Sequence, residues 1–384
     1  MAPVQPTATA SRAGSTGHPP TGTPWILHSL ARWLPLSEQF VHSVVTTSRH
    51  PGMVVARKPL EHTDVFPHRP VHSLKWIPTS VGWATERRLV TASLRVLTAL
   101  RPVGLVHHHH GYGATLATGI ARRRRIPLVV SLHGQDVVPH GQVFPADYAE
   151  VFDTAHAVVV PSQFLVGPAL SIGARADTVH VIPSGVDTAY FAPVPLPEGP
   201  PEVAFVGRFV EKKGLDVLLA AWPSVRAAVP GATLRLVGYG PLEALARRGD
   251  SGVVVEAADP SRRRAQVRQT LARARVVVTP SRTAADGDAE TLLIVNLEAQ
   301  ALGRPLVTTR HGGIPEYVDE GRTALVVPEN DADALADALV TLLVDDDAAR
   351  AMADAGPPWA ARFDVTLCTA RLDDLYDTLM GQSR

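Results

Sequence analysis

The segment VGRFVEKKG, residues 206–214, joins a predicted strand to a predicted helix and is the most informative part of the sequence about its fold. The apolar, β-branched run Glu202–Val206 leads into it, and the amphipathic pattern Leu215–Val229 follows it. The same order of a short apolar strand and a longer amphipathic helix recurs on both sides of this unit. Such repetition predicts parallel sheets that are covered by helices on both faces.

The loop itself predicts an anion-binding pocket. Gly207 lets the backbone turn tightly and approach a ligand, and Arg208 and Lys213 lie beside the start of the following helix. Guanidinium, ammonium and helix dipole all favour an anion such as a diphosphate. A surface loop with ordinary ion pairs is the alternative, but lysine is so scarce in this chain that its presence here favours function. The lysines are Lys58, Lys75, Lys212 and Lys213.

Outward from this loop, the sequence predicts two doubly wound sheets. The strands of the first are Trp25–Leu30, Met53–Arg57, Gly104–His108, Pro127–Leu132, Ala157–Val160 and Thr178–Ile182. The strands of the second are Glu202–Val206, Thr233–Val237, Val253–Glu256, Val276–Thr279, Pro305–Thr308 and Ala324–Val327. The clearest helices are Ala84–Leu100, Ala114–Arg124, Gln163–Ile172, Leu215–Val229, Arg262–Ala272 and Thr291–Leu302. Ligands of such sheets bind beyond the carboxyl ends of the strands, so we expect a cleft where the two sets of strand ends face each other.

A proline-rich segment divides the chain. Residues Ala192–Pro201, APVPLPEGPP, are too rich in proline to build a core and are typical of a hinge or linker. The last helix pattern, Val365–Met380, is expected to pack back across this linker. The predicted units are a disordered tail at 1–22, a Rossmann-like domain at 23–192, a linker at 193–201, a second Rossmann-like domain at 202–362, and a C-terminal helix region at 363–384 that packs back towards the first domain.

Composition excludes several classes of function. Of the 384 residues, 45% are hydrophobic and 19% are charged, with 37 basic and 37 acidic side chains. This balance argues against a nucleic-acid-binding polycation and against a strong pull towards an anionic bilayer. The single cysteine, Cys368, excludes an intramolecular disulfide and a cysteine-based zinc cage. With no apolar run of membrane-spanning length and no apolar core of a signal peptide, we expect a soluble cytoplasmic enzyme.

A pair of glutamates forms a second candidate site. The segment Asp286–Gln300, DGDAETLLIVNLEAQ, places Glu290 just before a predicted helix and Glu298 eight residues later. Eight helical residues return to within about 80° of the starting direction, so both carboxylates can face one side. A carboxylate inside an apolar helix needs a partner, and the two hydroxyls of a ribose fit it. The amides from Thr291 onwards are free at the predicted helix start and can meet a phosphate.

The order of these motifs resembles the retaining GT4 family of glycosyltransferases with the GT-B fold, nearest to its exopolysaccharide and colanic-acid branch. The motifs are GRFVEKKG, LVGYGPL, the Glu-x7-Glu pair and RHGGIPEYV, and the resemblance runs over residues 25–380. It implies that a hexosyl group moves from a UDP- or GDP-sugar to a hydroxyl of a saccharide or a small natural product. The implied reaction retains the anomeric configuration and uses no metal ion and no further cofactor.

The resemblance also implies roles for individual residues. Arg208 and Lys213 hold the diphosphate and stabilise the leaving group, while Glu298 holds the ribose hydroxyls and Glu290 contacts the hydroxyls of the donor hexose. Leu293 is bulkier than the residue usual in the family, which can narrow the space around the donor phosphate or sugar. The donor-binding positions are completed by Gly207, Gly238 near the nucleobase, Thr291, Leu292 and Ile294.

In the first domain, the segment SLHGQD places His133 at the family's HG-x-D position, where a histidine reaches the transferred sugar. A structural histidine at a strand end is the alternative. In the same loop, Gly134 belongs to the acceptor side and Asp136 is expected to orient the loop.

The acceptor side is also expected to include the start of the first helix. Ser37 can cap this helix, and Glu38, in a segment resembling the family's SET or SEQ start, can face the acceptor. His109 and Gly111 match a segment of the family at the cleft rim.

Other charged or histidine-rich patterns are weaker evidence for a metal or ligand site. The triplet Asp286–Asp288 spells the DxD of metal-dependent glycosyltransferases of another fold, but nearby cations already serve the phosphates. The run His107–His110 resembles a metal site, but alternate strand residues point to opposite faces. We therefore expect no metal. The basic runs Arg122–Arg125 and Arg262–Arg264 are expected to be solvated faces, with phosphate or partner binding as the alternative.

Two other functions remain open. A nucleotide-sugar epimerase or hydrolase on the same architecture would need no acceptor. A binding protein with two α/β lobes is disfavoured by the missing signal peptide and by the glutamate pair beside a cationic pocket. We expect no nucleic-acid partner and at most weak peripheral contact with a membrane, and the oligomeric state stays open.

Overall fold

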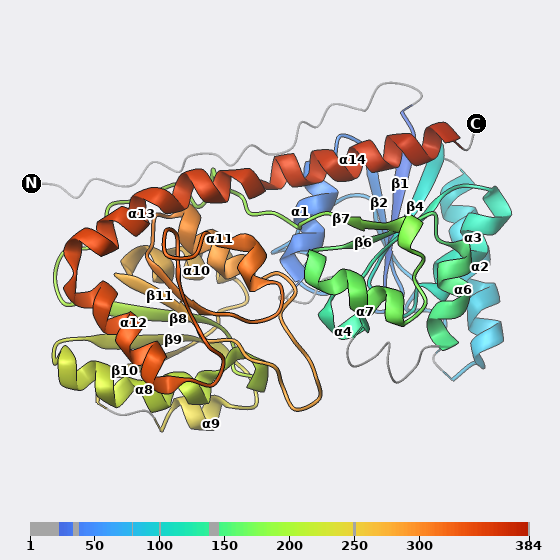
Figure 1. Ribbon diagram of the computed structural model, residues 1–384. Coiled ribbons are helices and arrows are strands. Elements are labelled where there is room, and N and C mark those ends of the chain that lie inside the picture. Colours follow the sequence, from blue (N-terminus) through green and yellow to red (C-terminus); the bar gives the residue numbers. More distant parts are fainter. Residues whose placement is uncertain are drawn as a thin grey trace, which may run out of the picture.

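The structure, a computed structural model, describes residues 23–33, 38–78, 80–99, 101–137, 146–248 and 251–382. Two sheets, parallel throughout, form the cores of two domains that lie side by side in Figure 1. This arrangement confirms the predicted doubly wound fold, and the strands begin and end within two residues of their predicted bounds. The predicted tail and the predicted cap Ser37 lie outside the described residues.

The first sheet has seven strands in the order β3-β2-β1-β4-β5-β6-β7. They are β1 (Trp25–Leu30), β2 (Gly52–Ala56), β3 (Val71–Ser73), β4 (Val103–His109), β5 (Leu128–Ser131), β6 (Ala157–Val160) and β7 (Val179–Val181). The helices are α1 (Gln39–Thr47), α2 (Trp83–Ala99), α3 (Thr115–Arg124), α4 (Gly134–Val137), α6 (Ala146–Thr154) and α7 (Val166–Ser171). The sequence did not predict β3, because three partly buried residues carry no periodic signal.

The second sheet has six strands in the order β10-β9-β8-β11-β12-β13. They are β8 (Glu202–Arg208), β9 (Thr233–Tyr239), β10 (Val253–Ala257), β11 (Val276–Thr279), β12 (Leu306–Thr309) and β13 (Leu325–Val327). The helices are α8 (Leu215–Ala228), α9 (Glu243–Ala246), α10 (Arg263–Arg273), α11 (Ile294–Ala301), α12 (Ala332–Val344), α13 (Asp346–Ala360) and α14 (Val365–Gln382).

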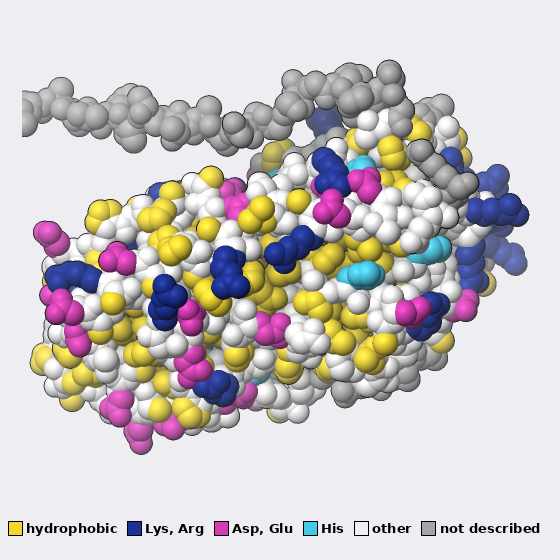
Figure 2. Space-filling view, turned by 45° about the horizontal axis from the view of Figure 1, so that its top comes forward, with side chains coloured by type: hydrophobic (Ala, Val, Ile, Leu, Met, Phe, Trp, Pro, Cys, Tyr) yellow, Lys and Arg dark blue, Asp and Glu magenta, His cyan; other side chains and the backbone are white. Residues whose placement is uncertain are grey.

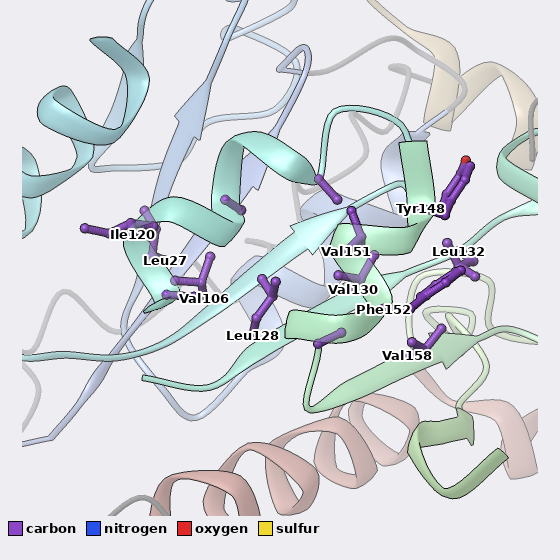
Figure 3. Packing of buried hydrophobic residues seen from close by; sticks show 14 of the residues in the cluster. Leu27, Val106, Ile120, Leu128, Val130, Leu132, Tyr148, Val151, Phe152 and Val158 are labelled. Carbon is purple, nitrogen blue, oxygen red and sulfur yellow. The ribbon is translucent and has the colours of Figure 1, made fainter. Parts of the chain in front are cut away.

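The core of the first domain explains why its strands are apolar along their whole length. Figure 3 shows side chains of β4, β5 and β6 packed against α3 and α6. Val130 and Val158 of the sheet lie beside Val151 and Phe152 of α6. Burying each such side chain contributes about 1.5–3 kcal/mol relative to leaving it exposed. The opposite face of the sheet is covered by α14. The polar ends of the strands therefore lie at the edge of the sheet.

The chain crosses between the domains twice, at adjacent points. The amide of Val186 donates to the carbonyl of Phe363 at 2.9 Å, and the amide of Val365 donates to the carbonyl of Val186 at 2.8 Å. The proline-rich segment, in contrast, lies along the second domain. There the buried guanidinium of Arg304 donates to the carbonyls of Val194 and Pro195. The predicted domain boundaries themselves stay predictions.

The C-terminal helix α14 lies over the first domain in Figure 1, roughly in line with α13, which lies over the second. Its buried residues Leu372, Tyr376 and Leu379 belong to one apolar cluster with Ile26 of β1 and Leu105 of β4. No helix in the described part of the chain is long and apolar enough to cross a membrane.

The surface mixes both signs of charge over most of the face that Figure 2 shows. Basic side chains gather there at the end of the molecule where α3 lies. The last turn of α3 holds the exposed Arg122, Arg123 and Arg124. This run is therefore a solvated face, as the sequence analysis expected.

Candidate functional site

A cleft of about 270 Å³ lies between the two domains, at the carboxyl ends of the second sheet. Gln39, Phe40 and Ser43 line it from the first domain. Nine of the ten predicted donor-binding positions line it: Gly207, Arg208, Lys213, Gly238, Glu290, Leu292, Leu293, Ile294 and Glu298. The structure therefore brings together residues that are up to 91 positions apart in the sequence.

The two predicted diphosphate ligands lie where β8 leads into α8. Lys213 ends a short 3-10 turn, Glu211–Lys213, and its Nζ lies 2.7 Å from Oε1 of Glu290. Burial lowers the pKa of Lys213, and Glu290 opposes this effect. Burial would raise the pKa of Glu290, but the nearby lysines outweigh it and lower that pKa to about 2. Arg208 has no carboxylate within ion-pair distance among the described residues. The pocket thus holds an unpaired guanidinium beside a charged Lys–Glu pair.

The DxD triplet is engaged by the protein itself. Lys212 Nζ lies 2.9 Å and 3.0 Å from the two carboxylate oxygens of Asp288. The carboxylate of Asp286 accepts the backbone N–H of Asp288 at 3.0 Å. This arrangement stabilises the loop that leads to Glu290.

The segment RHGGIPEYV positions the backbone of Glu290. His311 accepts the N–H of Glu290 at 3.0 Å through Nε2, while its Nδ1 lies 2.7 Å from a carboxylate oxygen of Glu329. The N–H of Gly313 donates to the carbonyl of Glu290 at 2.9 Å. Gly312 has φ +52°, and a Cβ there would lie 2.0 Å from the same carbonyl oxygen. The glycine pair therefore allows two backbones to lie in contact beside the cleft.

This contact also corrects the predicted start of the helix. The sequence predicted a helix from Thr291, whereas α11 begins at Ile294 with Leu293 as its N-cap. The hydrogen bonds of the Glu290 backbone to the neighbouring loop hold the preceding residues out of the helix. Thr291 instead faces the first domain, where its Cγ2 would lie 3.4 Å from a Cβ at Gly134. Thr291 does not line the cleft, and Glu298 lies about one turn inside α11.

Glu298 is partly buried in the same cleft. Burial raises its pKa to about 7, although Arg263 and Arg264 oppose this shift. Both arginines line the cleft, and Arg264 forms an ion pair with Asp187. The expectation that Arg262–Arg264 is a solvated face is therefore wrong for these two side chains. Their place just after the carboxyl end of a predicted strand was the signal that points to a ligand site.

Close approach of two strands explains the glycine at the predicted nucleobase position. Gly207 and Gly238 are paired residues of β8 and β9. A Cβ on Gly238 would lie 1.9 Å from the carbonyl oxygen of Gly207. Tyr239, which the sequence analysis did not single out, follows directly and lines the cleft with a partly exposed ring.

His133 lies at the end of the first sheet but does not line this cleft. It lines a separate cavity of about 30 Å³, and Phe40 lines both spaces. The rings of Phe40 and His133 have centroids 4.6 Å apart. Burial lowers the pKa of His133 to about 3, so the ring is neutral. Its Nε2 is buried without a hydrogen-bond partner among the described residues.

Asp136 orients this loop, as expected, because its carboxylate accepts the backbone N–H of His133 at 2.7 Å. It also lies 3.4 Å from Nδ1 of His110, whose Nε2 lies 3.4 Å from Glu38. Burial would lower the pKa of His110, but the two carboxylates raise it to about 10. His110 is therefore an imidazolium that links the start of α1 to the HG-x-D loop, and Glu38 faces it directly.

The predicted place of His109 at the cleft rim is not where the structure puts it. Strand β4 continues through His109, which is only 3% exposed. The next residue, His110, has φ +79° and turns out of the strand.

Direct contacts hold the two domains together. The carboxylate of Glu316 accepts the backbone N–H groups of Gln163 and Phe164 at 2.6 Å and 2.7 Å. A Cβ at Gly134 would lie 2.9 Å from the carbonyl oxygen of Ala289. The HG-x-D loop is thus packed against the segment that carries Glu290.

Comparisons with known proteins agree with this architecture. Residues 21–190 match the family described as Glycosyltransferase Family 4, and residues 200–345 match the one described as Glycosyl transferases group 1. The chain belongs to the GT4 family of glycosyltransferases and has the GT-B fold, which confirms the resemblance seen in its motifs.

Its relatives include the GDP-mannose-dependent alpha-(1-6)-phosphatidylinositol monomannoside mannosyltransferase of Mycobacterium tuberculosis. The two are 33% identical over 329 residues, which cover 81% of this chain and 77% of that protein. The putative colanic acid biosynthesis glycosyltransferase WcaL of Escherichia coli (strain K12) is 29% identical over 297 residues, with coverage of 71% and 72%. The structure of Anabaena Alr3699/HepE in complex with UDP and glucose has a TM-score of 0.77 at 19% identity, with coverage of 91% and 99%. At this low identity, the similarity to the Anabaena protein concerns the fold alone.

Proposed function

We propose that this glycosyltransferase moves a hexosyl group from a nucleotide-diphosphate sugar to an acceptor hydroxyl, with retention of configuration and without a metal ion. One observation carries the proposal. Arg208, which has no ion-pair partner among the described residues, lines a cleft of about 270 Å³ together with Glu298 and an ion pair. In this pair, Nζ of Lys213 lies 2.7 Å from Oε1 of Glu290. Two cations for a diphosphate, a carboxylate for a hexose and a carboxylate for a ribose are the groups such a donor requires.

A GDP-hexose is the donor we favour. The mannosyltransferase relative named above is GDP-mannose-dependent and is 33% identical to this chain. The UDP complex belongs to a protein only 19% identical, so it supports the fold more than the choice of base. Leu293, which is buried at the start of α11, lines the cleft and limits the space beside the donor. GDP-mannose is thus the first donor to test.

The proposed chemistry needs little from the protein beyond positioned charge. As the bond between the anomeric carbon and the diphosphate breaks, negative charge grows on the leaving oxygen. Arg208 and Lys213 stabilise that charge, which is where preorganised cations contribute most. The acceptor oxygen bonds to the anomeric carbon on the face that the diphosphate leaves. Its proton passes to an oxygen of the departing phosphate.

Closure of the two domains would exclude water from the reacting sugar. The hydrogen bonds of Glu316 to the first domain are suited to this role. His133, with its unpartnered Nε2, is proposed to reach the transferred sugar once Phe40 moves aside. The acceptor would then enter from the side of α1.

Ligand binding tests the donor site. Thermal unfolding of the protein is measured with a panel of nucleotides and nucleotide sugars, since selective ligands raise apparent stability by mass action. We expect GDP-mannose to raise it, and Lys213→Ala and Glu298→Ala to abolish the shift. Lys75→Ala and Glu198→Ala change exposed residues of the same types and serve as controls. Unchanged binding by the first two variants would overturn the site.

Turnover separates transfer from the alternatives. The protein is incubated with the donor alone and with candidate acceptors, and the anomeric configuration of the product is read by NMR. Transfer predicts an acceptor-dependent product with the configuration of the donor. Rapid turnover without an acceptor would favour an epimerase or a hydrolase instead.

A further inference from the structure

Three histidines that the proposed transfer does not use gather inside the first domain. His28 of β1 and His107 of β4 are paired residues of neighbouring strands. His109 lies two positions further along β4, so its side chain points to the same face as that of His107. All three are almost fully buried, with exposed fractions of 0%, 1% and 3%.

The spacing of their nitrogens suits a metal ion. One ring nitrogen of each lies within 4.8 Å of those of the other two. Nδ1 of His28 and Nε2 of His109 are 3.0 Å apart. Two imidazole nitrogens bound tetrahedrally to zinc, each at about 2.0–2.1 Å, lie about 3.3 Å from each other. The two rings would therefore need to separate by only a few tenths of an ångström to coordinate one zinc ion.

The chemical state of the rings also suits a metal ion. Burial lowers the pKa of His28 to about 3, and it lowers those of His107 and His109 well below their usual value. The rings are therefore neutral, which is the form that coordinates a metal. Nε2 of His28 is buried without a hydrogen-bond partner among the described residues.

The surroundings can hold one of these rings in place and supply a further ligand. Nε2 of His107 lies 2.7 Å from the hydroxyl of Ser131, and Nδ1 contacts the hydroxyl of Tyr376 on α14. Either bond can orient the ring while the other nitrogen coordinates. The cavity of about 30 Å³ beside His107 and His109 has room for a water as fourth ligand.

We propose that His28, His107 and His109 form a binding site for Zn²⁺ that ties β1 and β4 together beneath α14. Three imidazoles and a water match the ligands that zinc prefers. The ion would stabilise the first domain and takes no part in the proposed transfer, so the two proposals stand or fall separately. A hydrogen-bonded histidine cluster without an ion is the alternative.

Metal analysis of the full chain, purified without a histidine tag, tests the proposal. We expect about one equivalent of zinc after dialysis against free Zn²⁺, and a tetrahedral Co²⁺ absorption spectrum when Co²⁺ replaces it. His28→Gln and His107→Gln should each weaken binding by at least about 10-fold. The control His108→Gln changes a residue on the opposite face of β4, which contacts Ser29, and should leave binding unchanged.

Two results would overturn the proposal. One is a protein that retains almost no zinc and gives no Co²⁺ spectrum. The other is an unchanged zinc content in both variants, which would show an adventitious ion only. Should the variants fail to fold, X-ray absorption of the zinc-loaded wild type decides: three imidazole nitrogens at about 2.0 Å support the site, and any other ligand set contradicts it.

Discussion

At the scale of single residues, the charges of the cleft are unevenly partnered. Lys212 is engaged by Asp288, and Lys213 lies against Glu290, but Arg208 has no carboxylate partner in the part of the chain described. In the proposed complex, the diphosphate therefore binds a guanidinium that has no carboxylate to displace. It would also compete with Glu290 for Lys213, which frees that carboxylate for a sugar hydroxyl.

Glu298 predicts that donor affinity depends on pH. Its pKa of about 7 means that part of the population is protonated at neutral pH, while only the carboxylate accepts two hydrogen bonds from a ribose. Affinity for a nucleotide sugar should therefore rise with pH up to about 7 and level off above it. Below this pKa the change approaches about 10-fold per pH unit.

Calorimetric titrations with a nucleotide sugar between pH 5.5 and 8.5 measure this profile, since the phosphates of such a donor do not titrate there. Glu298→Gln should bind more weakly at high pH and show a flat profile. If the affinity of the wild type and of Glu298→Gln changed equally with pH, the proposed role of Glu298 would be contradicted.

His110 predicts a pH dependence of stability. Its pKa is raised from 6.5 in the unfolded chain to about 10 by Asp136 and Glu38, against the effect of burial. The stabilisation is therefore complete below pH about 6.5 and is lost as the pH rises towards 10. His110→Gln should lower the free energy of unfolding by about 3 kcal/mol at pH 6. Denaturant unfolding at several pH values should show this difference shrinking above pH 7, whereas parallel curves would rule out the ion pairs.

The positions of single residues were predictable where a charged residue lies between a clear strand and a clear helix. Arg208 and Lys213 lie between a predicted strand and a predicted helix, and the structure places both in the cleft. His109 was assigned to the rim because periodicity does not show where a strand ends. In the structure, β4 continues through His109, and the chain leaves the strand at His110, which has φ +79°.

At the scale of elements, the site depends on two loops that touch. The backbone of Glu290 lies between His311 and Gly313, and this contact delays the start of α11 until Ile294. The sequence contained the motif RHGGIPEYV but no sign of what it touches. The predicted start at Thr291 was wrong for that reason, because a non-local contact overrides local helix propensity.

Gly312→Ala is predicted to disable the donor site. A Cβ there would clash with the carbonyl oxygen of Glu290 at 2.0 Å. The matched control is Gly321→Ala, since Gly321 also has a positive φ but has nothing within 4 Å of its Cβ position. The backbone strain costs about 1–2 kcal/mol in both variants. Only Gly312→Ala should lose nucleotide-sugar binding in calorimetry, and equal binding by both would refute the positioning role.

At the scale of the whole molecule, the two sheets and their helices were predictable because strand and helix patterns alternate along the chain. The path of the segment that links the two domains was harder to predict. A proline-rich composition indicates a segment without a core, but the structure packs part of this one on Arg304 of the second domain. The hydrogen-bonded segments around Val186 and Phe363, where the chain passes between the domains, have no compositional signature.

Glu316 predicts a link between domain closure and activity. Hydrogen bonds to a charged group contribute about 1.5–3 kcal/mol each, and this carboxylate accepts two from the other domain. Glu316→Ala should increase the radius of gyration in small-angle scattering and lower kcat/KM by about 10-fold or more. Glu320→Ala, which removes an exposed partner of Arg310 in the same segment, should do neither. A compact Glu316→Ala with full activity would disprove the link.

The donor site is tested by a crystal structure of the protein with GDP-mannose, or with UDP-glucose should that bind better. We expect the diphosphate between Arg208 and Lys213, the ribose hydroxyls on Glu298 and the hexose beside Glu290. A nucleotide sugar bound elsewhere, or a diphosphate that contacts neither cation, would contradict it.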